Sequence, residues 1–216
     1  MEISIPDATH ARVKAPAFVS LSTIEQFVIS KSRWIHHRFE ERKKTAAALQ
    51  AKKYAHGYEF LFLGQSYPLH MELHPIAKPQ FTFQDNRWVL ATPEPLAENA
   101  VKEYVLAWYR QEAGEIFASR IFHYSRLMGQ APLKITVKTQ KRLWGSCNPK
   151  GQSINLNWLL AMAPLAVIDY VIVHELSHLK IPNHSKRFWN YVQEFSPDYQ
   201  SHHQWLKTNH HRMLLP

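Results

Sequence analysis

The chain of 216 residues has a single cysteine, Cys147, so it cannot form an internal disulfide. One thiol is typical of a protein that works in a reducing compartment. Glycine is also scarce, at six residues, and no Gly-rich phosphate loop of the Walker type is present. These absences exclude a disulfide-stapled scaffold and a P-loop nucleotide-binding protein.

Long hydrophobic runs are missing as well. The longest apolar stretch, residues 158–173, is broken by Pro164 and Asp169, which makes it too short for a membrane span and typical of a buried helix. The N-terminal stretch MEISIPDATHARVKAPAF has no continuous apolar segment behind its charges, so no secretory signal is visible. We expect a soluble, cytoplasmic protein with no membrane partner.

Acidic residues are outnumbered: 17 Asp and Glu against 26 Lys and Arg give a net charge of +9. This surplus permits a phosphate-bearing partner such as nucleic acid or a nucleotide, an acidic substrate, or merely a solvated basic surface, and charge alone does not choose among them. A hydrophobic content of 45% and a charged content of 20% are those of an ordinary globular protein.

Hydrophobic periodicity predicts an α+β chain without repeats or a flexible linker. Its best internal boundary lies near Gly129, between residues 1–128 (a helix, a β-meander and a long helix) and a catalytic region at residues 129–216, and the two parts are expected to form one continuous domain. The predicted elements are a helix opened by a capping box at Ser22 to Glu25, two strands within residues 60–73, a hairpin over 81–91 turning at Asp85-Asn86, a helix from Pro95 to about Met128, strands over 133–139 and 153–159, a helix from Pro164 to about Ile181, and a short helix through residues 188–192.

The motif His174-Glu175-Leu176-Ser177-His178 falls within the predicted helix that follows Pro164. Residues four apart on a helix share a face, so the imidazoles of His174 and His178 can converge on one point. Glu175 lies about 100° around the helix, where it can reach a water on a bound ion without being a ligand. This HExxH pattern is typical of a zinc site with glutamate as general base.

A third imidazole is available where the helix must stop. Pro182 ends the helix and His184 follows in the turn, so His174, His178 and His184 together supply the three protein ligands of a catalytic zinc site. Two other interpretations stay open. The polar groups could satisfy one another by ordinary hydrogen bonds, or the zinc could be purely structural, although structural sites usually have four ligands rich in cysteine.

Residues 138–189 resemble the YgjP-like metallopeptidase family, which is related to the zincin and SprT-like group. The matching elements are WGSC, the strand G-x-x-I-x-L-N, the lead-in P-x-x-V-I-D-Y, HELSH and NHS-x-x-FW, and the resemblance continues through SPDYQSHHQWLK. The spacing of the three histidines also matches metzincins, but those carry Gly where this chain has Ile181.

The resemblance implies zinc at His174, His178 and His184 with Glu175 as catalytic base. It also implies a compact zincin-like core in which the HExxH helix lies beside a β-hairpin, preceded here by a helix and a β-rich N-terminal section. The family usually has Arg immediately before WGSC, whereas this chain has Leu143 there. Arg142 would take that place only with a register shift.

Four residues are candidates for substrate contact: Arg142, Trp144, Asn155 and Asn157. Trp144 can equally shape the hairpin, and the two asparagines, which point the same way from their strand, can equally hydrogen-bond a loop. Candidates for stabilising an oxyanion are Tyr191, His202 and Arg142.

The cysteine and the C-terminal histidines near these motifs are interpreted without a catalytic role. Cys147 is more typical of a packing residue than of a nucleophile. The C-terminal histidines His202, His203, His210 and His211 are interpreted as exposed surface, because they share no helix face with a glutamate.

Three functions remain open from the sequence. The first is a zinc-dependent peptidase in which Glu175 activates a zinc-bound water and an edge strand around residues 153–158 aligns an extended peptide. The second is a metal-dependent hydrolase of nucleotide phosphoanhydrides, of the nucleoside triphosphate pyrophosphatase type, which rests on charge alone. The third is a nucleic-acid-binding module whose metal only stabilises the fold.

Overall fold

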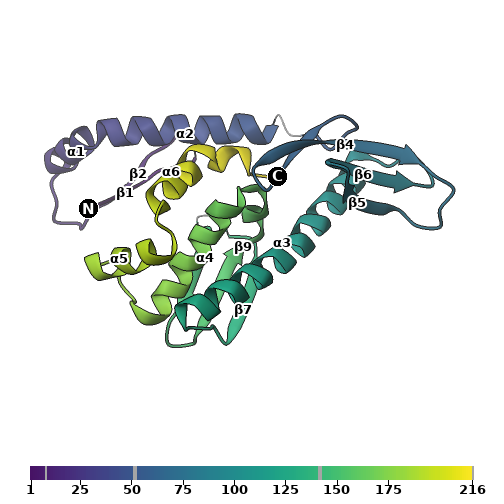
Figure 1. The fold of residues 1–216 in the computed structure, drawn as a ribbon. Coiled ribbons are helices and arrows are strands. Elements are labelled where there is room, and N and C mark those ends of the chain that lie inside the picture. The colour runs from purple at the N-terminus through teal and green to yellow at the C-terminus, as the bar shows by residue number, and fades with distance from the viewer. Residues whose placement is uncertain (8, 51–52, 141–142, 216) are drawn as a thin grey trace. The chain divides into compact units, whose positions relative to one another are not determined.

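The computed structural model describes residues 1–7, 9–50, 53–140 and 143–215, and its fold is α+β. Figure 1 shows the order of the elements along the chain. Packing divides the chain into two units, one formed by Met1–Lys52 with Leu214–Pro216 and the other by Lys53–Met213. The second unit contains all the residues of the HExxH motif. No helix in the described part of the chain combines the length and the apolarity needed to cross a bilayer.

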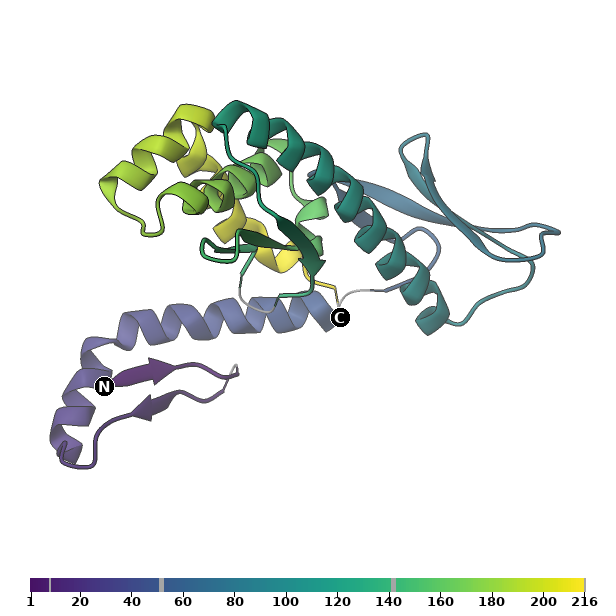
Figure 2. The ribbon, with the colours of Figure 1, turned by 90° about the horizontal axis from the view of Figure 1, so that it is seen from below.

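The first unit is a small β-hairpin with two helices. Strands β1 (Glu2–Ser4) and β2 (Arg12–Lys14) pair antiparallel, and helices α1 (Leu21–Ser30) and α2 (Ser32–Gln50) follow. The guanidinium of Arg42 on α2 donates to the carbonyl of Ile5, which ties the hairpin to the helix. Figure 2 shows the hairpin beside these helices.

One sequence-based expectation concerns this unit. The capping box at Ser22 is wrong, because Ser20 is the N-cap of α1 and its hydroxyl accepts from the backbone N–H of Thr23. The charges of α2 pair with one another at i,i+3 spacing, with Arg38 2.8 Å from Glu41. Such pairs are typical of a solvated helix surface.

The second unit begins with a four-stranded sheet of order β3-β4-β6-β5. Its strands are β3 (Glu59–Phe62), β4 (Gln65–Leu73), β5 (Gln80–Gln84) and β6 (Arg87–Thr92). The predicted hairpin of β5 and β6 is confirmed, and positive φ angles of 49° at Asp85 and 57° at Asn86 are those of a tight primed turn. The parallel pairing of β4 with β6 was not foreseen.

Helix α3 (Glu98–Met128) packs its buried side on this sheet, and Gly129 ends it with a left-handed φ of 66°, as the sequence predicts. A cluster of aromatic rings fills the junction. Trp88 of β6 lies 4.4 Å from Trp108 and 5.3 Å from Tyr109 by ring centroids, and the hydroxyl of Tyr109 donates to the carbonyl of Leu61.

The turn between β3 and β4 holds the start of the helix that carries the HExxH motif. Backbone N–H groups of Leu63 and Gly64 donate to the carbonyls of Ala161 and Met162 in the 3₁₀ helix η1 (Trp158–Met162). Gly64 has a φ of 86°, and a Cβ there would lie 2.6 Å from Cγ of Pro164. Only glycine fits this approach, so the sheet supports the N-cap of the next helix directly.

The second sheet has three strands in the order β7-β9-β8: β7 (Lys134–Lys138), β8 (Gly145–Asn148) and β9 (Ser153–Asn157). β9 pairs in parallel with β7 and antiparallel with β8. The expectation that the strand around residues 153–158 is an edge strand is therefore wrong, because both its edges are already hydrogen-bonded. The edge positions belong to β7 and β8.

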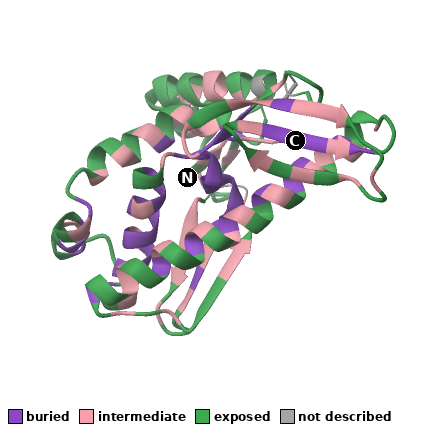
Figure 3. Cartoon of the chain, turned by 45° about the vertical axis from the view of Figure 1, so that its right-hand side comes forward, coloured by how far each residue is buried: buried purple, intermediate pink, exposed green. Residues whose placement is uncertain are grey.

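Three helices complete this unit: α4 (Leu165–Lys180), α5 (Lys186–Phe195) and α6 (Tyr199–Asn209), followed by the short η2 (His210–Arg212). α4 is buried along most of its length (Figure 3). An ion pair joins it to α3: the guanidinium of Arg120 on α3 donates to both carboxylate oxygens of Asp169 on α4, at 2.6 and 2.7 Å. The division predicted near Gly129 falls between α3 and β7 inside this unit, and the expectation that residues 1–128 and 129–216 form one continuous domain stays a prediction.

Candidate metal centre

Helix α4 brings together the two outer residues of the HExxH motif. Pro164 is its N-cap, and the apolar residues before the motif are buried, so the helix is fixed in rotation by its packing. With that rotation set, His174 and His178 share one face a turn apart, and Glu175 faces the protein interior with 5% of its surface exposed.

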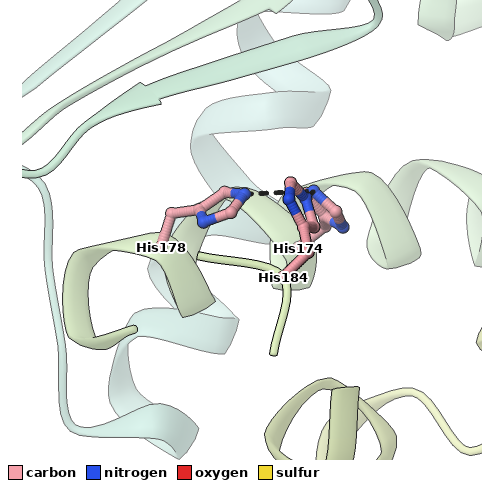
Figure 4. A group of neighbouring side chains, drawn as sticks. All are labelled: His174, His178 and His184. Atoms are coloured by element: carbon pink, nitrogen blue, oxygen red, sulfur yellow. Dashed lines mark hydrogen bonds between the residues drawn. The ribbon is translucent and has the colours of Figure 1, made fainter. Parts of the chain in front are cut away.

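The third histidine comes from the turn between α4 and α5. The helix stops because Ile181 is extended, with φ of −132°, and Pro182 follows. Ser185 then caps α5, with its carbonyl accepting from the N–H of Trp189. His184 lies in this short turn and is exposed. Because the chain reverses direction here, His184 lies beside His174 and His178 (Figure 4).

The three imidazoles converge through their Nε2 atoms. Nε2 of His174 lies 3.2 Å from Nε2 of His178 and 3.1 Å from Nε2 of His184, and one ligand atom from each ring lies within 4.8 Å of the others. A tetrahedral zinc with Zn–N bonds of 2.0–2.1 Å separates its ligand nitrogens by about 3.3 Å. The donor set and its spacing therefore fit a divalent ion such as zinc.

Protonation also suits coordination. Nδ1 of His178 lies 3.3 Å from the carbonyl of Ile181, which can only accept, so Nδ1 carries the proton and Nε2 keeps its lone pair. Burial, followed by the neighbouring histidines, lowers the pKa of His174 to about 3, and burial lowers that of His178. Both rings are thus in the neutral, ligating form. Nδ1 of His174 is buried and no described residue bonds to it.

Phe188 of α5 forms the wall behind the triad. Its ring, fully buried, stacks on His178 at 4.5 Å and lies 5.0 Å from His174 and 4.9 Å from His184 by centroids. Sequence reasoning placed Phe188 only on a helix face. The signal that could have found it is its position in the first turn of the helix that follows His184.

Glu175 packs against the strand β8. A Cβ built on Gly145 would lie 2.6 Å from Oε1 and 2.9 Å from Cδ of Glu175, so the absence of a side chain at Gly145 makes room for this carboxylate. Burial raises the pKa of Glu175 to about 8. In its ionised form this carboxylate is therefore a stronger base than an exposed glutamate, and β8 packs against it.

The Gly145→Ala variant is expected to lower peptide hydrolysis about 10- to 100-fold, because the new methyl must push the Glu175 side chain aside and a displacement near 1 Å costs on that order. Bound zinc should be unchanged, since no ligand is touched. Gly114→Ala is the matched control, because a Cβ at Gly114 on α3 meets nothing within 4 Å. Equal activity in both variants would contradict a fixed position for Glu175.

The residues suggested for substrate contact have their own partners. Asn157 is buried and its amide donates to the carbonyls of Gln140 and Leu143, while its oxygen accepts from the N–H of Leu159. The amide of Asn155 donates to Ser146 on β8. Both therefore organise the loop and hairpin beside the site.

Two of the suggested residues are less defined by the structure. Trp144 is half-buried just before β8, and its carbonyl accepts from the N–H of Asn157. Arg142 lies outside the described residues. A substrate role for any of the four stays a prediction.

The structure also bears on Tyr191, a candidate for oxyanion binding, and on Cys147. Tyr191 is turned toward the end of α3, where its hydroxyl donates to the carbonyl of Met128 and accepts from Gln130, so it is not free to bind an oxyanion. Burial, and then the charge of Glu175, raises the pKa of Cys147 to about 11, which keeps its thiol protonated and unreactive.

The C-terminal histidines are only partly at the surface. Of the four interpreted as exposed, His203 is exposed, but His202, His210 and His211 are half-buried. The ring of His202 packs 6.3 Å from that of Tyr170 on α4, and its Nδ1 is buried. The surface interpretation is therefore wrong for three of them.

Three convergent imidazoles beside a buried glutamate, on an α+β scaffold, place the chain among metal-dependent hydrolases. A family model described as YgjP-like, metallopeptidase domain, matches residues 1–209. The chain belongs to this YgjP-like metallopeptidase family, and it is thus a metal-dependent protease that acts on peptide or protein.

Among solved structures, the chain is similar to the crystal structure of the metallopeptidase zymogen of Pyrococcus abyssi abylysin. The identity is 23%, the match covers 43% of this chain and 93% of that one, and the TM-score is 0.41. No curated protein matches the sequence.

Proposed function

We propose that the chain is a zinc-dependent peptidase in which His174, His178 and His184 hold the ion and Glu175 is the general base. The observation that carries this proposal is the approach of three Nε2 atoms to 3.1 and 3.2 Å beside a buried carboxylate on the same helix. Three lone pairs at such separations repel one another unless a cation or protons lie between them.

Zinc, when bound, supplies a Lewis acid that polarises the scissile carbonyl and lowers the pKa of water. Glu175 then acts in two steps. Its carboxylate accepts a proton from the attacking water and passes it to the nitrogen of the leaving amine. The buried position of Glu175 supports this role, because desolvation makes the carboxylate more basic than usual and β8 prevents it from turning away.

The substrate strand is proposed to lie along β8 (Gly145–Asn148). Within the described residues, β8 pairs on one side only, with β9, and its other edge carries unpaired backbone groups. An extended peptide can add to such an edge through main-chain hydrogen bonds. Because Gly145 touches Glu175, a peptide held on β8 would pass close to the general base.

A substrate screen with controlled metal content tests this function. Protein without a histidine tag is expected to contain about one zinc per chain and to cleave unstructured peptides, with activity lost after chelation and restored by zinc. Nucleoside triphosphates and duplex DNA form the other arms. Cleavage of triphosphates without peptides, or salt-dependent DNA binding without hydrolysis of any substrate, would contradict the proposal.

The nucleotide and nucleic-acid alternatives still rest on the net charge alone. A cytoplasmic location is likewise kept as a proposal, supported by the single cysteine.

A further inference from the structure

A hydrogen-bonded pair, Tyr170 and His203, lies beside the candidate metal centre and takes no part in the function proposed above. Tyr170 is one turn before His174 on α4, so the two share a face, and their rings meet edge to face at 6.0 Å. Tyr170 is 3% exposed. Its hydroxyl lies 3.2 Å from Nδ1 of His203, which comes from α6 and is exposed.

The imidazole of His203 belongs to the surroundings of the triad, although the two lie on different helices. Tyr170 lies between them, because its ring centroid is 6.0 Å from that of His174 and 6.2 Å from that of His203. Stacked rings hold α6 in this position: Tyr199 stacks on Tyr170 at 6.5 Å and on Trp189 at 5.1 Å, and Trp189 lies 5.7 Å from His174.

The hydrogen bond determines which nitrogen of His203 carries a proton. The Tyr170 hydroxyl is within donating distance of Nδ1, and burial with the charge of Lys207 lowers the pKa of His203, which favours the neutral ring. A neutral imidazole that accepts at Nδ1 carries its one proton on Nε2. His203 then offers an N–H donor from an exposed ring beside the site.

We propose that His203 is a catalytic residue whose Nε2–H donates to the substrate carbonyl oxygen as negative charge develops there, and that Tyr170 is the positioning residue that fixes this tautomer. The inference rests on the proposed peptidase function. It fills the role for which Tyr191, His202 and Arg142 were candidates, of which Arg142 lies outside the described residues. Tyr191 is occupied at the end of α3, and the Nδ1 of His202 is buried.

Steady-state kinetics test the pair. Loss of one oxyanion donor costs about 10²- to 10³-fold, so His203→Ala should lower kcat by that factor with KM nearly unchanged. His203→Gln keeps an N–H near the Nε2 position and should recover part of the loss. Tyr170→Phe removes only the hydroxyl and should cost about 2- to 10-fold, the value of one neutral hydrogen bond.

The double variant Tyr170→Phe with His203→Ala should match His203→Ala alone, because the hydroxyl acts through the imidazole. Gln204→Ala is the control, since Gln204 is the next residue on α6, is exposed, and donates to Thr208. Zinc content and melting temperature are measured for every variant. A merely structural link between α4 and α6 would lower stability without a selective loss of kcat.

Nitrogen-15 NMR of histidine-labelled protein gives a readout independent of activity. The His203 signal, assigned by its loss in His203→Ala, should show protonated Nε2 in the wild type and a mixture of tautomers in Tyr170→Phe. A proton on Nδ1 in the wild type would overturn the inference even if peptidase activity is present. So would an active wild type whose His203→Ala variant keeps kcat within threefold. A wild type that binds zinc and cleaves no peptide would overturn the proposed function as well.

Discussion

Replacing Glu175 with Gln is expected to remove most peptide hydrolysis while zinc remains bound. The amide has nearly the same shape as the carboxylate but cannot accept a proton, and general acid–base groups contribute about 10²- to 10⁴-fold. The fold should survive, because Glu175 is 5% exposed and burying a neutral amide costs less than burying a charge. The measurement is kcat/KM on an unstructured peptide together with zinc content.

Glu194→Gln provides the control, because Glu194 is an exposed carboxylate on α5 and its loss should change neither quantity. Undiminished turnover in Glu175→Gln would remove Glu175 from the mechanism. Loss of zinc in the same variant would show instead that the carboxylate acts on the ion or its ligands.

Replacing His178 with Ala is expected to abolish stoichiometric zinc binding. Loss of a group that only supports a ligand typically weakens metal affinity 10- to 100-fold, so loss of a ligand should exceed about 100-fold. Stability gives a second readout. A ligand at 1,000 times its Kd stabilises a protein by about 4 kcal/mol, so zinc should raise the melting temperature of the wild type and leave that of the variant unchanged.

His123→Ala is the matched control, since His123 is an exposed histidine on α3 away from the triad. His174→Ala and His184→Ala should behave as His178→Ala does, because the three nitrogens form one donor set. An unaltered zinc response in His184→Ala would leave only two protein ligands from α4 and would contradict the three-histidine site.

The candidate site was predictable because its information is local. The spacing of His174 and His178 is a property of one helix, and Pro182 with His184 sets the end of that helix within a few residues. The β5–β6 hairpin was predictable for the same reason, since Asp85 and Asn86 encode their own turn. Patterns of period 3.6 or 2 report on neighbours along the chain.

Contacts between distant segments escaped prediction. Nothing around residue 153 shows that β9 is paired on both sides, because its second partner, β7, is brought beside it by packing. Asp169 binds Arg120, which lies 49 residues away along the chain, so no local pattern predicts this ion pair. The pairing of Tyr170 with His203 likewise depends on how α6 folds back.

The ring of Phe188 has a consequence for how the ion is acquired. Because it touches all three imidazoles, their rotamers are held by packing and need little rearrangement when a cation arrives. Small zinc-finger domains, by contrast, fold only as they coordinate. We therefore expect the scaffold to fold before the ion binds, so that coordination adds stability to ligands that are already ordered.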